Sequence, residues 1–477
     1  MRRRGASDSE SSSSRQSPGF DNPLEIEPAE QERRQEMMNG VNGNDAADAA
    51  AMLQGNNSGV GEEEANPDGS VDLRIFTLNC WGLRFISAKR RERFEAIGRY
   101  LSGGNYDVVM LQEVWNEEDF LTVKTAVAAV FPHSHFFDNG IIGSGTCIFS
   151  RTLIFDATFH EFGMNGYPHK IWHGDWFGGK GLGVCQIEFK GFDVHLYTSH
   201  YHAEYNRKRD VYLGHRVSHG LESAQWIKLT SASADLTVYA GDFNTEPTDV
   251  PYKLVRAVAP LRDAWIDVHG DGPGGETCEV PGNSFTSAAA LRECPRGKRI
   301  DYIMYGAGPN VLAAAVECEK PLPQRISGKE FSYSDHEAVC ATIKLIRSKD
   351  VFQKSTDFRR MLSKECRIDC VKAVKDAIGI IERSQNTVNK DHLRYGMIAA
   401  VFLILFVLTF LPGILVDPKW YGLVDVLVFV PRFLFTVAFV FFVLMATIFN
   451  KKEKNALSST KSSLRLILDQ DKIQRVS

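Results

Sequence analysis

The 477-residue sequence lacks several features that would direct it to common functional classes. Its nine cysteines include no Cys-x-x-Cys pair, so neither a zinc site nor a thioredoxin-like redox motif is indicated. An odd number of widely spaced cysteines is typical of free thiols in a reducing compartment. No apolar segment follows Met1–Gly5 directly, so we expect no cleavable signal peptide.

The chain also lacks an excess of basic residues. Its formal net charge is −4, whereas nucleic-acid-binding proteins usually carry a basic surplus, so we expect no nucleic acid among its partners. The charge is unevenly distributed. Residues 1–69 contain 6 Lys and Arg against 14 Asp and Glu, whereas residues 451–477 contain 7 basic and 3 acidic residues and form a predicted basic tail.

Residues 1–69 have few large apolar side chains. They are rich in Ser, Asn, Gly, Ala and Glu, and Phe20 is their only aromatic residue. Such a segment cannot bury enough apolar surface to offset the entropy lost on ordering. We therefore predict a disordered N-terminal leader over residues 1–69.

From residue 70 the pattern becomes that of a globular domain. Short apolar runs bounded by Gly, Asn or Asp predict strands, and runs with helical spacing predict helices between them. The predicted strands are Leu73–Leu78, Val108–Leu111, Val194–Thr198, Leu236–Ala240 and Ile300–Tyr305, and the predicted helices are Lys89–Leu101, Glu117–Val130 and Val211–Leu229. This order predicts one large α/β domain over residues 70–347.

Residues 348–394 are predicted to form a basic amphipathic helix or linker. They carry 11 basic and 7 acidic side chains, and apolar residues such as Val374 and Ile381 recur at heptad-like spacing. The simpler interpretation is a spacer packed against the domain. The alternative is a basic face held near anionic lipid headgroups, which makes anionic lipids candidate partners.

Residues 395–450 contain two strongly apolar runs. The first, 395–416, has no charged residue and is long enough to cross a bilayer. The second, 423–449, is nearly as apolar but contains Asp425, Pro431 and Arg432. The runs predict a transmembrane hairpin. Lysines and arginines flank both ends of the pair, which places the domain in the cytosol. We expect the endoplasmic reticulum, with other endomembranes or the plasma membrane as alternatives.

Six short polar motifs follow one another, most of them at the end of a predicted strand. Ligand groups in α/β sheets usually lie where a strand runs into a loop. Together the motifs supply carboxylates, amides and histidines, which are the groups needed to hold a hard cation and to move protons during phosphodiester hydrolysis. They are Leu78–Gly82, Leu111–Trp115, Ser199–His202, Gly241–Asn244, Arg299–Tyr302 and Ser334–Glu337.

This ordered series resembles the endonuclease/exonuclease/phosphatase (DNase I-like) superfamily. The resemblance implies a four-layer α/β sandwich, in which two packed mixed β-sheets are flanked by helices, here followed by the C-terminal helical hairpin. The segments between the motifs resemble neutral sphingomyelinases that have two C-terminal membrane helices. The stretches that carry this second resemblance include Gly140–Gly145, Asn165–Pro168, His173–Phe177 and His202–Asn206.

The resemblance implies an activity and a cofactor. We expect a phosphodiesterase that hydrolyses sphingomyelin in the bilayer to ceramide and phosphocholine, with Mg²⁺ as cofactor and Mn²⁺ as a substitute. Mg²⁺ prefers a few carboxylates, substrate oxygens and retained waters, whereas zinc would require His and Cys ligands together.

The resemblance also assigns roles to single residues. Glu113 resembles the central metal carboxylate, and Asn79 resembles the amide beside it that binds metal or phosphate oxygen. Asp242 and Asn244 resemble the pair that orients the attacking water and the phosphate. Asp335 is a further candidate for contact with the metal or the substrate.

The two predicted catalytic histidines come from different motifs. His336 resembles the general base, and His200 resembles the histidine that acts on the leaving alkoxide. Asp301 resembles the carboxylate that orients a catalytic histidine. Lys180, in a glycine-rich stretch, is a candidate phosphate ligand, and in related sphingomyelinases a Lys and an Asp at the spacing of Lys180 and Asp175 form a switch-like pair. A flexible surface loop around Lys180 is the alternative.

Other functions remain compatible with the same motifs. A phospholipase C acting on choline lyso-phospholipids would cleave the same bond beside the same headgroup. A nuclease or an inositol phosphatase would share the fold, but the charge and the hairpin disfavour a nuclease. A membrane scaffold without catalysis is the alternative from another functional class, and the six intact motifs argue against it.

Overall fold

The computed structural model describes residues 69–347 and 351–476. The predicted leader therefore lies outside the described residues, apart from Gly69. The five predicted strands and three predicted helices are all present, with bounds that differ from the predictions by no more than three residues. The strands and helices were predicted correctly because each packs at least one apolar face against the core.

Two six-stranded sheets form the centre of the domain, in the orders β11-β12-β1-β2-β4-β3 and β5-β6-β7-β8-β10-β9. The strands of the first sheet are β1 (Val71–Asn79), β2 (Val108–Gln112), β3 (His133–Phe136), β4 (Cys147–Ser150), β11 (Val311–Glu319) and β12 (Val339–Arg347). The strands of the second sheet are β5 (Ile154–Glu161), β6 (Gly181–Phe189), β7 (Phe192–His200), β8 (Leu236–Asp242), β9 (Arg262–Asp263) and β10 (Asp301–Ala307).

Each sheet contains one parallel strand pair among antiparallel neighbours. In the first sheet β1 and β2 are parallel, and in the second β7 and β8 are parallel. Both sheets are therefore mixed, as predicted. Parallel neighbours bring the carboxyl ends of their strands to the same sheet edge, and this edge carries the predicted site residues.

The strands alternate between two buried faces. Leu73 and Ile75 of β1 join Leu236 and Val238 of β8 in a core between the sheets, whereas Phe76 of β1 belongs to a second core outside the first sheet. This alternation follows from the two-residue period of a strand. Both faces of β1 are covered from Ile75 onward, whereas Asp72 and Arg74 near its start are only partly buried.

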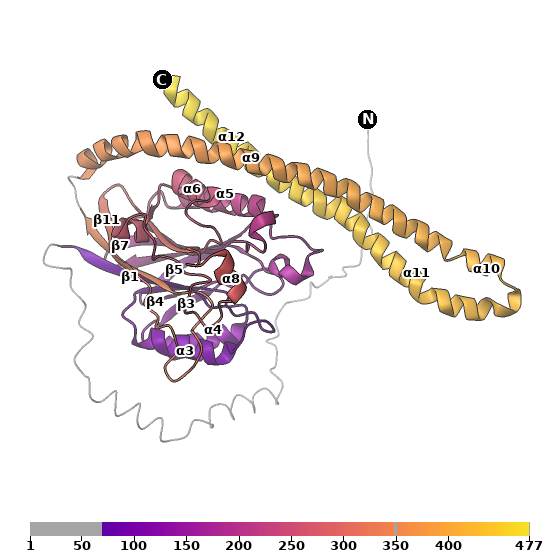
Figure 1. Cartoon of the computed structure of the whole chain (residues 1–477). Coiled ribbons are helices and arrows are strands. Elements are labelled where there is room, and N and C mark those ends of the chain that lie inside the picture. Colours follow the sequence, from indigo (N-terminus) through magenta and orange to yellow (C-terminus); the bar gives the residue numbers. More distant parts are fainter. Residues whose placement is uncertain (1–68, 348–350, 477) are drawn as a thin grey trace, which may run out of the picture. The chain divides into compact units, whose positions relative to one another are not determined.

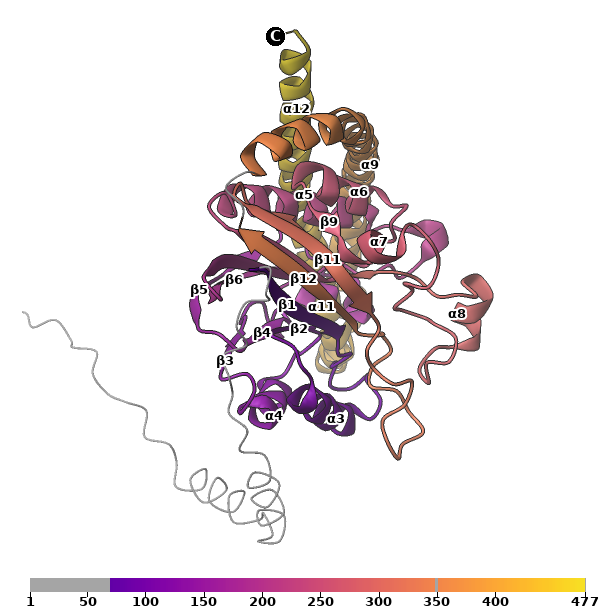
Figure 2. The same cartoon turned by 90° about the vertical axis from the view of Figure 1, so that its left-hand side faces the viewer.

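Helices cover the outer face of each sheet, and the predicted four-layer sandwich is confirmed. α3 (Arg90–Gly103) and α4 (Glu117–Val127) cover the first sheet, and α5 (Leu213–Thr230) and α6 (Val250–Val258) cover the second. Figures 1 and 2 show the two helical layers on opposite sides of the sheets. Short helices in the connections are α7 (Ala264–His269), α8 (Ala288–Glu293), η1 (Ile171–His173), η2 (Asp175–Phe177) and η3 (Arg207–Arg209).

Two long helical stretches follow the domain. Their elements are α9 (Val351–Leu408), α10 (Leu411–Leu415), η4 (Pro418–Trp420), α11 (Tyr421–Leu444), the π-helical η5 (Met445–Phe449) and α12 (Asn450–Val476). Two helices are long and apolar enough to cross a membrane, judged by length and composition. α9 is continuous through 58 residues, so the predicted linker and most of the first predicted span form one helix.

The ends of these helices that lie nearest the domain pack against it. Val374 and Ile381 of α9 and Leu457 and Leu464 of α12 are buried in the core that contains α5 and α6, and Figure 1 shows α9 running along those helices. The segment predicted as a basic tail is thus a packed helix over most of its length. Leu457 and Leu464 are seven residues apart, which places them on one helix face. This apolar signal is weak because the segment around it is mostly polar and basic.

Candidate active site

The register of the strands brings the predicted site residues together. Asn79 at the end of β1 lies beside Gln112 of β2, so Glu113 begins the loop next to it. In the second sheet Asp242 at the end of β8 pairs with His200 of β7 on one side and with Asp301 of β10 on the other. Residues more than 200 positions apart in the sequence therefore share one edge of the sandwich.

Asn79 links the two sheets. Its Nδ2 donates hydrogen bonds to Glu113 Oε1 at 3.1 Å and to Asp242 Oδ2 at 2.9 Å. Its Oδ1 accepts a hydrogen bond from the backbone N–H of Trp81 at 2.9 Å. In this arrangement Asn79 holds two carboxylates together through its nitrogen. The role in metal binding predicted for Asn79 stays a prediction.

The backbone around Glu113 and Asn244 is strained. Their φ angles are 57° and 45°, in the left-handed region that non-glycine residues rarely occupy. Such strain persists where the surroundings fix the chain, and it is frequent at functional sites. Gly82 is part of these surroundings, because a Cβ at that position would lie 2.1 Å from the Glu113 carbonyl oxygen.

Asp242 and Asn244 form a compact pair at the end of β8. The Asp242 carboxylate accepts hydrogen bonds from the backbone N–H of Asn244 at 2.8 Å and from its side-chain Nδ2 at 3.1 Å. Burial raises the pKa of Asp242 to about 7, and the negative charge of Asp301 adds to the effect. A nearby cation would favour the ionised form of this carboxyl group.

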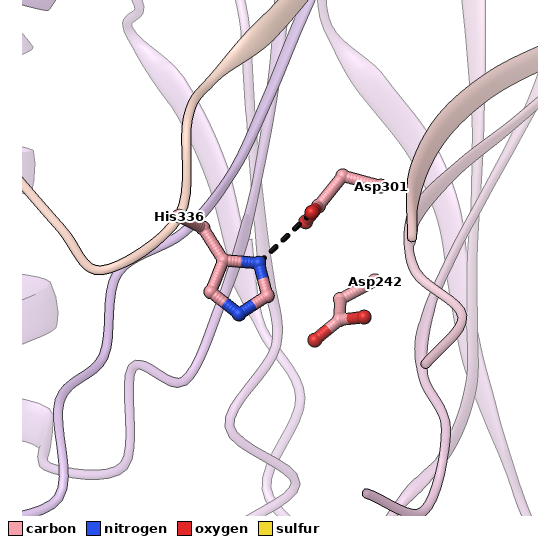
Figure 3. A group of neighbouring side chains, drawn as sticks. All are labelled: Asp242, Asp301 and His336. Atoms are coloured by element: carbon pink, nitrogen blue, oxygen red, sulfur yellow. Dashed lines mark hydrogen bonds and ion pairs between the residues drawn. The ribbon is translucent and has the colours of Figure 1, made fainter. Parts of the chain in front are cut away.

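Asp301 and His336 form a hydrogen-bonded dyad. The distance between His336 Nδ1 and Asp301 Oδ2 is 2.8 Å, and Figure 3 shows the other ring nitrogen directed away from Asp301, with Asp242 beside the ring. Thr277 Oγ1 also donates to Asp301 Oδ2, at 2.6 Å. Burial alone would lower the pKa of His336, but the neighbouring Cys278 and Asp301 outweigh burial and raise it well above its ordinary value.

His200 has the opposite electrostatic environment. Burial, followed by the positive charge of Lys180, holds the pKa of His200 well below its ordinary value. His200 Nε2 lies 3.1 Å from Lys180 Nζ and 3.5 Å from Asp242 Oδ2. The site thus contains one histidine that favours its charged form and one that favours its neutral form, because their neighbours differ.

Lys180 lies inside the site. It is 2% exposed, so the alternative of a flexible surface loop is wrong for this side chain. Its ammonium forms an ion pair with Asp175 and donates to the carbonyl oxygen of Tyr201 at 2.9 Å. Although burial alone would raise the pKa of Asp175, the Lys180 ammonium holds it well below its ordinary value. Lys180 Nζ also lies 3.1 Å from His200 Nε2, and its role as a phosphate ligand stays a prediction.

Asp335 lies next to this cluster, on the loop that carries His336. Burial raises its pKa to about 6, the charges of His336 and Arg93 oppose the rise, and the negative charge of Glu113 adds to it. Asp335 is thus close enough to Glu113 for their charges to interact, and its predicted contact with a metal or the substrate stays a prediction.

Sequence reasoning missed Arg93 and Thr277, which hold the site loops in place. Arg93 is fully buried, and its guanidinium donates to the carbonyl oxygens of Cys80 and Trp81, each at 2.6 Å, and to that of Tyr333 at 3.1 Å. Arg93 therefore ties the loop after Asn79 to the loop before His336. No local signal distinguishes Arg93 within a basic stretch of α3, or Thr277 within an irregular loop.

The donor set fits a hard divalent cation. Asp242, Asp301 and His336 each offer a ligand atom, and these atoms lie within 4.8 Å of one another. His336 Nδ1 and Asp301 Oδ2 already bond to each other, however, whereas Glu113 and Asp242, which Asn79 Nδ2 holds close together, offer further carboxylate oxygens for such an ion. Asp301 Oδ1 is buried without a hydrogen-bond partner among the described residues.

Comparison with known proteins places the chain in a family. Residues 76–336 match the family model described as Endonuclease/Exonuclease/phosphatase family. A putative neutral sphingomyelinase of Drosophila melanogaster is 42% identical over 277 residues, which cover 58% of this chain and 62% of that protein. Sphingomyelin phosphodiesterase 2 of Homo sapiens is 39% identical over 282 residues, covering 58% of this chain and 66% of that protein.

A third relative aligns over more of the chain. A putative neutral sphingomyelinase of Caenorhabditis elegans is 34% identical over 416 residues, which cover 83% of this chain and 91% of that protein. The alignments with the Drosophila and human proteins span less than two thirds of those proteins. The family match contains most of the cluster, from the strand that carries Asn79 to His336 itself. The chain therefore belongs to the endonuclease/exonuclease/phosphatase family and, within it, to the neutral sphingomyelinases.

Proposed function

We propose that the chain is a membrane-anchored, Mg²⁺-dependent phosphodiesterase that hydrolyses sphingomyelin to ceramide and phosphocholine. One observation carries the proposal. Glu113, Asp242 and the Asp301–His336 dyad converge on one sheet edge, opposite a neutral His200 paired with Lys180. This set contains the groups for cation binding, for activation of water and for delivery of a proton.

The metal-binding part of the proposal involves three carboxylates. Glu113 and Asp335 would hold Mg²⁺, with Asp242 close by, and the ion would supply positive charge against the phosphate oxygens. Asn79 Nδ2 keeps Glu113 and Asp242 close together by donating one hydrogen bond to each. Asp242 and Asn244 would orient the attacking water.

The proton transfers are assigned to the two histidines. His336 takes the proton of the attacking water on Nε2, because Asp301 holds Nδ1 and makes the ring a strong proton acceptor. The leaving alkoxide would receive its proton from the Lys180 ammonium by way of neutral His200, since Lys180 Nζ lies 3.1 Å from His200 Nε2, and Lys180 would be left uncharged.

The hairpin accounts for access to an insoluble lipid. No residue of α11 is buried, although its sequence is strongly apolar, so a bilayer is the environment that suits it. An active site anchored at the bilayer surface meets its substrate at a high effective concentration. We place the domain on the cytosolic face, with the endoplasmic reticulum as the membrane, because basic residues flank both ends of the hairpin.

The experiment measures phosphocholine release by the full-length protein in detergent micelles with Mg²⁺ or with EDTA. The substrates are sphingomyelin and a choline lyso-phospholipid, and abasic DNA is tested in parallel for cleavage. We expect Mg²⁺-dependent turnover of sphingomyelin above that of the other two. Glu113→Gln and His336→Ala should each lower it by at least about a hundredfold, whereas Glu188→Gln and His133→Ala serve as matched controls. Faster turnover of the lyso-lipid or of DNA would refute the substrate assignment.

A further inference from the structure

A cavity separate from the catalytic cluster lies where the helical hairpin meets the domain. Its volume is about 210 Å³, several times the ~30 Å³ that one water molecule occupies in the liquid. The loop from Gly163 to Gly179 forms one wall, and α9, η5 and α12 form the other. None of Asn79, Glu113, Asp242 and His336 lines it.

The cavity is at the level where the proposed membrane spans begin and end. Tyr395, at the start of the first span, contacts His169 with ring centroids 5.6 Å apart. Phe449, at the end of the second span, contacts Trp176 at 6.0 Å. In the proposed membrane hairpin, this depth is that of the lipid headgroups, where aromatic side chains are enriched.

The lining combines aromatic rings with a carboxylate. Tyr167, Trp176, Tyr395 and Phe449 line the cavity together with Glu453. The Glu453 carboxylate is half-buried and accepts a hydrogen bond from the Tyr167 hydroxyl. Burial raises the pKa of Glu453 to about 7, while Tyr167 and the charge of Lys170 oppose the rise, so a bound cation would favour the ionised form.

Aromatic walls beside a carboxylate suit a quaternary ammonium ion. Ring faces attract a cation that carries no N–H donors, and the carboxylate supplies the opposite charge. Lys452 also lines the cavity and is exposed, so it can meet the phosphate of the same headgroup. Glu161, Asp391 and Glu453 bring three carboxylates to the lining, against the one ammonium of Lys452. This excess of negative charge disfavours an anionic headgroup.

We propose that this cavity is a second, non-catalytic binding site for the choline headgroup of a bilayer phospholipid. The site rests on the proposed membrane hairpin but does not depend on hydrolysis. A bound headgroup would pack against Trp176, the neighbour of Asp175 in the Asp175–Lys180 pair. It would thus hold the domain against a choline-rich bilayer while the catalytic cluster stays free for substrate.

The test measures lipid binding to the full-length protein in detergent by native mass spectrometry, in EDTA so that turnover is absent. Phosphatidylcholine, phosphatidylethanolamine and phosphatidylglycerol with identical acyl chains are compared. We expect preference for phosphatidylcholine. Glu453→Gln keeps the hydrogen bond to Tyr167 and should weaken phosphatidylcholine binding roughly fivefold, and Tyr395→Leu should weaken it as well. Glu188→Gln, an exposed glutamate outside the cavity, should leave binding unchanged.

Three outcomes would overturn the proposal. Equal binding of the three lipids to the wild type would remove the headgroup assignment, and unchanged binding by Glu453→Gln would remove the site. Displacement of the lipid by soluble phosphocholine would assign the cavity to the free headgroup instead of a lipid. Short-chain sphingomyelin hydrolysis in Mg²⁺ should match the wild type in Glu453→Gln. A failure of the wild type to hydrolyse sphingomyelin would leave the binding result standing, so the two proposals are tested separately.

Discussion

Single side chains in the site differ most in their electrostatic environment. His336 and His200 share one edge of the sandwich, yet the pKa of His336 is raised and that of His200 is lowered. Cys278 and the carboxylate of Asp301 account for the first shift, and burial beside Lys180 accounts for the second. Chemically identical residues thus acquire different roles from the groups around them.

Asp301→Asn tests this account at the residue scale. Because His336 must be deprotonated to act as a base, activity should fall as pH decreases through its raised pKa. Removing the Asp301 charge lowers that pKa, so the acidic limb of the kcat/KM profile should move to lower pH. The rate at its maximum should fall by about 10² to 10⁴, since general-base catalysis contributes a factor of that size. An acidic limb at the same pH in both proteins would exclude the dyad as the base.

At the scale of elements, the C-terminal helices belong to the domain as well as to the proposed membrane anchor. Val374 and Ile381 of α9 and Leu457 and Leu464 of α12 are buried against α5 and α6. A chain ending at Arg347 would expose the apolar surface that these residues cover. We therefore expect such a truncated chain to lose solubility as well as its anchor.

Leu457→Ala measures how strongly α12 is docked. Leu457 is 1% exposed, so its truncation should lower the free energy of unfolding by about 3 kcal/mol, as for other buried leucines. Leu466→Ala is the matched control, because Leu466 lies on the same helix and is 64% exposed. Its effect should stay within about 0.5 kcal/mol. Thermal unfolding in detergent measures both, and equal melting temperatures would mean that α12 is not packed on the domain.

At the scale of the whole molecule, several histidines are buried in neutral form between the second sheet and α5. Burial lowers the pKa of His202 to about 4 and that of His219 to about 3. In the unfolded chain a histidine titrates near 6.5. Their contribution to stability is therefore complete above pH 6.5 and is lost as the pH falls toward the folded-state values.

The prediction is a loss of stability between pH 7.5 and pH 5. Each of His202 and His219 should contribute about 2 kcal/mol to that loss. Asp242 and Asp335 have raised pKa values and act in the opposite direction, so the wild-type slope alone does not isolate the histidines. Comparing the pH dependence of stability of His219→Gln with that of the wild type isolates the contribution of His219. The variant should lose less stability on acidification, and identical pH dependences of the melting temperature would contradict the assignment.

The sequence by itself determined the elements and most members of the site. The short run Leu73–Leu78 predicted β1, and alternate side chains of that strand do enter the same core. The ordered motifs predicted Glu113, Asp242 and His336, because each stands next to a strand end or in a motif of its own. These signals are local, so they can be read without knowing what packs against them.

Only the tertiary structure decided which groups touch. Arg93 on α3 bonds to Tyr333, 240 residues away in sequence, as well as to nearby Cys80, and Leu457 of α12 packs into the same core as α5. The opposite pKa shifts of His200 and His336 likewise depend on Lys180 and Asp301, which come from other strands and loops. Burial and charge at a site are sums over neighbours that are distant in sequence, and no local pattern contains them.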